Sequence, residues 1–314
     1  MVFFALSGFF IHLRAGETLR AGTAPPKLPA GRFLARRAHR LVAPYGFALL
    51  VTVLCDLVGR AWFPALYAGQ TGDVLLDQTF ARGGYATDNV LPALVLLPSS
   101  LGHDFGSNGP LWSLAYEVIY YLLYPAWLAV RRRSALAAFG AVPAACLALT
   151  LLPGAPFLPL VLIHYPIWLA GAFLAERLPG LQPSQRSVML SAALFAAGLL
   201  GHRASNWLAA SILATILFGG AAVTACALAP GRGCPAWWVR LFEYFGIRSY
   251  TIYMVHMPFV SLLGAWLIHA GGRPMHGWFA AGGAVLAIGL SCACFELCER
   301  HFLHARLRVG QARA

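Results

Sequence analysis

Long apolar stretches separated by short polar ones constrain this chain more than any other feature of its sequence. A transmembrane helix needs about 20 mostly apolar residues, because each residue rises about 1.5 Å and the bilayer core is about 30 Å thick. Nine stretches approach that length, at residues 2–13, 41–58, 109–130, 135–152, 157–176, 187–201, 207–229, 249–270 and 277–298. The pattern predicts an all-α polytopic membrane protein with about nine transmembrane helices.

The composition also excludes other classes of protein. Of the 314 residues, 59% are hydrophobic and only 11% are charged, whereas a soluble domain carries about 25% charged residues. The 23 Lys and Arg exceed the 11 Asp and Glu, for a formal charge of +12. No basic cluster interleaved with stacking aromatic residues lies outside the apolar stretches. We therefore expect the lipid bilayer, and not nucleic acid, as a partner.

The positive charges are segregated between alternate loops. Nineteen of the 23 Lys and Arg residues fall in one set of loops. The other set holds only Arg60, Arg82, Arg203 and Arg273. The richer set should be cytoplasmic, which predicts a cytoplasmic C-terminus and an external Met1. Because the stretch 2–13 is short and begins at Met1 itself, we expect a further segment of the protein upstream.

The seven cysteines lie almost entirely in apolar stretches. Cys292, Cys294 and Cys298 are close in sequence, but no His or carboxylate at zinc-like spacing accompanies them. We interpret the cysteines as small packing residues and expect no bound metal or cofactor. The sequence also contains no phosphate-binding glycine loop and no soluble-hydrolase motif.

A carboxylate lies inside the stretch 109–130. Glu117 is accompanied by Trp112, Tyr116, Tyr120 and Tyr124, which recur every four residues and so share one helix face. Ionisable residues in a membrane are costly and are functional candidates by default, and an aromatic, hydroxyl-bearing face suits a sugar. An aromatic belt with a structural Glu117 is an equal alternative.

Two arginines stand three residues apart at the cytoplasmic start of the stretch 41–58. Arg37 and Arg40 share a helix face and can hold the phosphates of an anionic ligand. From spacing alone, an ordinary positive-inside anchor explains the pair better.

Histidines are the remaining ionisable candidates. His256 lies about seven residues into the stretch 249–270, where an imidazole can act as a base or as a polar packing group. We favour packing for His164, and a solvated loop pair for His103 and Asp104.

These motifs, in this order, resemble the membrane-bound acyltransferase 3 family, which includes O-acetylases of bacterial lipopolysaccharide, exopolysaccharide and peptidoglycan and acylases of macrolides. Residues 3–11 resemble its F-F-x-L-S-G-F segment, residues 37–44 its R-x-x-R motif followed by proline, residues 112–117 its W-S-L-x-x-E helix, residues 249–256 its S-Y-x-x-Y-x-x-H helix, and residues 299–300 its closing E-R or E-P. The resemblance extends from the first residue to about Phe302. It implies a transmembrane domain over 1–302, followed by a basic cytoplasmic tail over 303–314.

The resemblance implies about ten helices in a bacterial inner membrane. In the family, the first helix carries an Arg and, about ten residues later, the His thought to handle acyl transfer. Neither residue can be assigned in this sequence, which agrees with the upstream segment expected from the charges. Either the start lies too far downstream, which we favour, or the product lacks its principal catalytic group.

The implied reaction moves an acyl group, most often acetyl, from acyl-CoA to a hydroxyl of a glycan or glycosylated small molecule. Acyl-CoA is then a co-substrate. By resemblance, the donor's phosphates bind Arg37 and Arg40, the acceptor meets Trp112 and Tyr116, Glu117 and His256 are catalytic, and Ser7 and Gly8 allow close helix contact around the donor or acyl passage. Two other functions remain open: a transporter or flippase of a glycoside or lipid-linked sugar, and an inactive family member.

Overall fold

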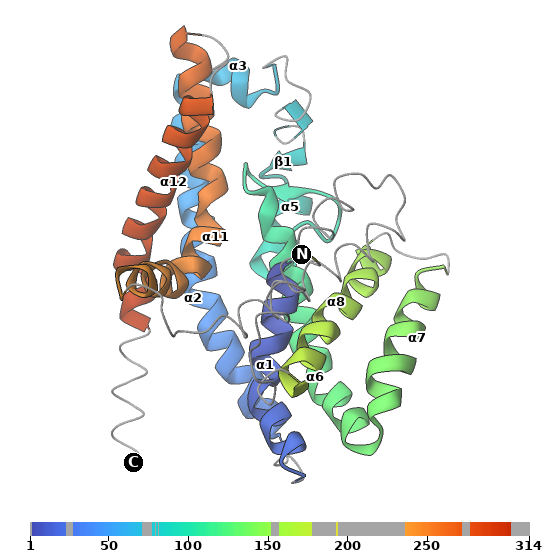
Figure 1. The fold of residues 1–314 in the computed structure, drawn as a ribbon. Coiled ribbons are helices and arrows are strands. Elements are labelled where there is room, and N and C mark those ends of the chain that lie inside the picture. Colours follow the sequence, from blue (N-terminus) through green and yellow to red (C-terminus); the bar gives the residue numbers. More distant parts are fainter. Residues whose placement is uncertain are drawn as a thin grey trace. The chain divides into compact units, whose positions relative to one another are not determined.

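The computed structural model describes residues 2–22, 28–70, 77, 78, 80, 82–151, 157–177, 193, 236–271 and 277–302. These residues are almost all helical, and the strands among them are two residues long (Figure 1). Contacts divide the chain into two units. The first comprises Met1–Phe33 and Ile119–Ala236, and the second comprises Leu34–Val118 and Trp237–Ala314.

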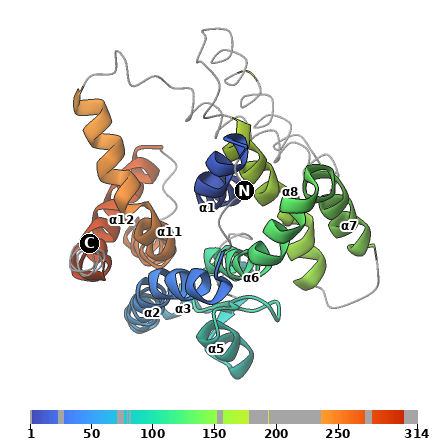
Figure 2. The same ribbon diagram turned by 90° about the horizontal axis from the view of Figure 1, so that it is seen from below.

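The first unit is built from helices around an aromatic core. It contains α1 (Val2–Arg20), most of α6 (Trp112–Arg133), the π-helical turn η2 (Ala137–Ala141), α7 (Val142–Leu149) and α8 (Phe157–Arg177). In both views α1 runs beside α8 (Figures 1 and 2). Large side chains with almost no exposed surface fill the interior, among them Phe4, Tyr120, Tyr124 and Trp168.

Small residues bring α1 and α8 into backbone contact. A Cβ added at Gly8 would overlap the carbonyl oxygen of Trp168, and one added at Gly171 would overlap the carbonyl oxygen of Ala5. Close approach through small residues is the usual way in which membrane helices pack. The indole Nε1–H of Trp168 also donates a hydrogen bond to Ser7 Oγ at 3.3 Å. Ser7 and Gly8 therefore lie in this helix–helix contact.

The second unit contains three long helices and short elements between the first of these helices and α6. Its elements are α2 (Ala30–Trp62, from Leu34 onward), α3 (Pro64–Tyr67), β1 (Gly83–Gly84), α5 (Thr87–Leu94), β2 (Asp104–Phe105), the 3-10 turn η1 (Gly109–Leu111), the start of α6, α11 (Ala236–Gly271) and α12 (Gly277–Leu297). Helices α2, α11 and α12 lie side by side in both views (Figures 1 and 2). Strands β1 and β2 are parallel and pair Gly83 with Asp104. The residues between the second and third apolar stretches thus include short regular elements.

Four helices of the described residues are long and apolar enough to cross a membrane. They are Ala30–Trp62, Phe157–Arg177, Glu243–Ala270 and Ala281–Phe302, and they match four of the predicted stretches. A shorter apolar helix, Ala137–Leu149, lies within the stretch 135–152. The all-α membrane architecture is confirmed, whereas the count of nine spans stays a prediction.

Other predicted boundaries differ from the structure or cannot be compared with it. Helix α1 has 19 residues, so it continues beyond the apolar stretch 2–13 into a polar end. Helix α11 begins at Ala236, well before the stretch 249–270. The predicted spans 187–201 and 207–229 and the tail 303–314 lie outside the described residues.

Candidate functional site

The start of α6 carries the carboxylate and the two aromatic residues predicted to meet an acceptor. Trp112 and Tyr116 are in edge-to-face contact, with ring centroids 5.0 Å apart, as their four-residue spacing on a helix requires. Glu117 is 3% exposed. The proline of η1, at position 110, precedes this helix and fixes the backbone where it begins.

The last two residues of the predicted aromatic stripe, Tyr120 and Tyr124, lie in the first unit, whereas Glu117 belongs to the second. The Tyr120 hydroxyl donates to the carbonyl of Val161 at 2.8 Å, and Tyr124 lies in the aromatic core of the first unit. Both rings are buried between packed helices. Only Trp112 and Tyr116 of the stripe therefore remain candidates for contact with an acceptor.

A tyrosine connects Glu117 to His256. Tyr253 on α11 donates a hydrogen bond to the carbonyl of Pro110 at 3.1 Å and lies 2.5 Å from the Ser113 hydroxyl. Its hydroxyl also interacts electrostatically with Glu117, and its ring centroid lies 5.8 Å from that of His256. The structure thus brings the start of α6 and the middle of α11 to one polar site.

The hydrogen bonds of His256 define its neutral tautomer. Its Nδ1 lies 2.6 Å from the carbonyl oxygen of Tyr253 and 3.2 Å from that of Ile252. Carbonyl oxygens only accept hydrogen bonds, so Nδ1 carries a proton, and in the neutral imidazole Nε2 carries the lone pair. The half-buried imidazole is therefore arranged to accept a proton at Nε2.

A cluster of charged side chains lies where α2, α11 and α12 meet. Arg37 is half-buried and Arg40 is exposed. Arg40 interacts electrostatically with the buried carboxylate of Glu299, which accepts a hydrogen bond from Thr251. Since Thr251 precedes His256 by five residues on α11, the cluster and the imidazole are separated by about 7.5 Å along that helix.

Two further arginines extend this cluster. Arg248 stacks on the Tyr244 ring at 3.7 Å and pairs with Glu296. Arg300 reaches the other oxygen of Glu296 at 2.7 Å. Guanidinium groups bind phosphate through paired hydrogen bonds, so this end of the unit can hold an anionic ligand. Sequence reasoning singled out Arg37 and Arg40 but missed Arg248.

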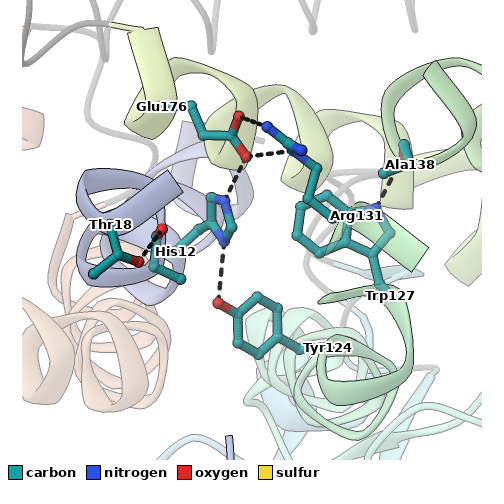
Figure 3. A network of polar contacts seen from close by, with 8 residues as sticks. His12, Thr18, Tyr124, Trp127, Arg131, Ala138 and Glu176 are labelled. Atoms are coloured by element: carbon teal, nitrogen blue, oxygen red, sulfur yellow. Dashed lines mark hydrogen bonds and ion pairs between the residues drawn. The ribbon is translucent and has the colours of Figure 1, made fainter. Parts of the chain in front are cut away.

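A second polar network lies inside the first unit (Figure 3). His12 is 0% exposed; its Nε2 lies 2.8 Å from Glu176 Oε1 and its Nδ1 lies 3.1 Å from the Tyr124 hydroxyl. Arg131 donates to both oxygens of Glu176, at 2.8 and 2.6 Å. The Trp127 ring and the imidazole are in edge-to-face contact, with centroids 5.1 Å apart. The network joins α1, α6 and α8.

Sequence reasoning missed this network. His12 and Glu176 both lie inside predicted apolar stretches. Ionisable residues in such stretches are usually functional or paired with one another, so each was a candidate. Their partnership across 164 positions has no local signal. His164, favoured as a packing residue, donates from Nδ1 to the carbonyl oxygen of Leu160, 2.6 Å away.

Among the described residues, no three His, Cys, Asp or Glu side chains gather in a way that could hold a metal ion. Cys55, Cys146, Cys292 and Cys294 are buried. His103 pairs with Asp88 at 3.3 Å, with both side chains about half exposed. Its predicted partner Asp104 instead accepts a hydrogen bond from Ser99.

The fold and these polar groups are those of a helical membrane protein with buried polar side chains. Comparison with known families shows which family of membrane proteins this is. The family model described as an acyltransferase domain matches residues 1–295. The chain therefore belongs to the acyltransferase 3 family. No curated protein and no solved structure shows a significant match to the chain.

Proposed function

We propose that the protein is an O-acyltransferase of the bacterial cell membrane, which moves an acyl group, most often acetyl, from acyl-CoA to a hydroxyl of a glycan or glycosylated small molecule. The observation that carries this proposal is the arrangement in the second unit. An arginine cluster lies about 7.5 Å along α11 from a histidine whose Nε2 holds a lone pair. Family membership supplies the reaction class.

The donor binds first at the arginine cluster. Arg37 and Arg40 hold the donor's phosphates, with Arg248 nearby on α11. Glu299 interacts electrostatically with Arg40 and favours its orientation toward this site. The thioester then extends along α11 toward His256.

The acceptor enters beside α6. Trp112 and Tyr116 contact its apolar ring face, and Glu117 accepts a hydrogen bond from one of its hydroxyls. His256 Nε2 removes the proton of the attacking hydroxyl. The new ester O–C bond forms as the thioester C–S bond breaks, and the proton passes to the departing CoA sulfur. The products are the acylated acceptor and free CoA.

The phosphate role is tested by Arg40→Ala, compared with Arg133→Ala as a control at an exposed arginine of the first unit. We expect the donor KM to rise by about 10-fold or more in the first variant, because a charge-assisted hydrogen bond contributes about 1.5–3 kcal/mol, and to stay unchanged in the second. A donor KM that is unchanged in Arg40→Ala would defeat the role assigned to this residue.

A further inference from the structure

A carboxylate that sequence reasoning overlooked lies inside a membrane-spanning helix. Asp56 belongs to the span Ala30–Trp62 and is 2% exposed. Its Oδ2 accepts hydrogen bonds from the Tyr85 hydroxyl at 2.7 Å and the Ser107 amide at 2.8 Å. Its Oδ1 accepts one from the Ser107 hydroxyl at 2.6 Å. These partners, among the described residues, lie between α3 and α6.

Tyr85 and Ser107 donate hydrogen bonds to both oxygens of Asp56. Burial and the neighbouring Asp56 charge raise the pKa of Tyr85, so its hydroxyl keeps its proton and donates. Gly106 has a φ of +54°, and an added Cβ there would overlap the Asp56 carboxylate and the Tyr85 hydroxyl. Only glycine allows the backbone to pass this close to Asp56.

The next residue ties the same segment to two helices. Asn108 is 0% exposed, and its Nδ2 donates to the Thr52 hydroxyl on α2 at 2.9 Å and to the Met254 carbonyl on α11 at 2.8 Å. Because a backbone carbonyl only accepts, this contact also fixes which way the amide points. Two residues later, the carbonyl of Pro110 accepts from Tyr253.

These contacts place irregular backbone at membrane depth. Met254 lies eleven residues after the start of the span Glu243–Ala270, or about 16 Å along the helix. Non-helical backbone at that depth is tolerated only where protein buries it or where it lines a cavity. The residues from Asp104 to Leu111 meet this condition through Asp56 and Asn108.

We infer that Asp56 is a positioning residue that holds Asp104–Leu111 as a re-entrant segment, and so sets the start of α6, with Trp112 and Glu117, against α11. The inference rests on the proposed function in one respect, which is that Trp112 and Glu117 meet the acceptor. The re-entrant placement itself does not depend on any activity.

Cysteine labelling of the detergent-purified protein tests the placement. In a background whose own cysteines are replaced by alanine, Ser113→Cys serves as the buried reporter and Leu101→Cys as the exposed control. We expect Asp56→Leu to raise the labelling rate of the reporter by a water-soluble maleimide about 10²-fold, because three buried hydrogen bonds are lost. Asp56→Asn, which keeps one acceptor oxygen, should stay close to the parent.

The result that overturns the inference is equal protection of the reporter in Asp56→Leu and its parent. If Asp56→Leu does not fold, Ser107→Ala removes one of the three bonds and should raise labelling about tenfold. Protection unchanged in that variant likewise overturns it. The rate at Leu101→Cys should not change in any of these variants.

Kinetics separate the positioning role from mere stability. Asp56→Leu should lower kcat/KM for the acceptor about 10²-fold, as expected for reacting groups displaced by about 1 Å, with the donor KM unchanged and with recovery in Asp56→Asn. Equal changes for donor and acceptor would contradict a positioning role. If the wild-type protein transfers no acyl group, the proposed function fails, while labelling still decides the re-entrant placement.

Discussion

The hydrogen bonds around His12 lead us to expect that Glu176→Gln, which replaces one carboxylate oxygen by an amide nitrogen, lowers the free energy of unfolding substantially. In Glu176→Gln the volume is kept, and the amide oxygen can still accept from His12 and from Arg131 Nε. The amide nitrogen then faces Arg131 Nη2, which donates to Glu176 Oε2 at 2.6 Å in the wild type. One charge-assisted hydrogen bond, worth about 1.5–3 kcal/mol, is lost, and the Arg131 charge is left without its counter-ion.

Breaking a buried ion pair by removing one partner costs about 3–5 kcal/mol. The side chains of Glu176 and Arg131 are 10% and 17% exposed, so water compensates Arg131 in part, and we expect a decrease of about 3 kcal/mol in the free energy of unfolding. The assay is reversible unfolding of the purified protein in mixed micelles, followed by the fluorescence of its tryptophans.

The control is Arg177→Gln, which removes an exposed charge at the adjacent position and should cost less than about 0.5 kcal/mol. A cost below about 0.5 kcal/mol for Glu176→Gln as well, which is the value typical of a surface ion pair, would refute the reasoning. In that case His12 would be held by packing with Trp127 and Tyr124 and not by the carboxylate.

Three further changes test the helix contact and the site. Gly8→Ala should destabilise the protein by about 3 kcal/mol, the upper end for overpacking, because the added methyl group meets the Trp168 carbonyl; normal thermal stability would contradict the backbone contact. His256→Gln should lower kcat by about 10²–10⁴-fold at unchanged donor KM, as loss of a general base does, whereas His269→Gln on the same helix should retain activity. Trp112→Ala should raise the acceptor KM and leave the donor KM alone, and the opposite pattern would argue against its place beside the acceptor.

The helices could be predicted from the sequence because burial in lipid demands long apolar runs. The stretches 41–58 and 157–176 coincide closely with helices that can span a membrane. The limits of α1 and α11 were less predictable, because both helices continue past their apolar parts into polar residues. Apolar content marks where a helix meets lipid, whereas backbone hydrogen bonding decides where it ends.

The site could be predicted only in its individual residues. Intramembrane ionisable groups drew attention to Glu117 and His256, but nothing local indicates that Tyr253 connects them. Asp56 was overlooked because a single acidic residue in a long apolar stretch scarcely alters its hydropathy. Its role depends on Ser107, 51 positions away, and contacts between distant positions leave no periodic pattern in one sequence.

The proposed reaction is the transfer of an acyl group from acyl-CoA to a hydroxyl. The most direct measurement incubates membranes containing the protein with acetyl-CoA labelled in its acetyl group, and follows the label into glycan or glycoside that loses it on mild alkaline hydrolysis. We predict alkali-labile label with the wild-type protein, together with release of free CoA, and about 100-fold less of both products, or lower still, with His256→Gln. Movement of a glycoside across the membrane without consumption of acetyl-CoA would contradict the account and would indicate a transporter.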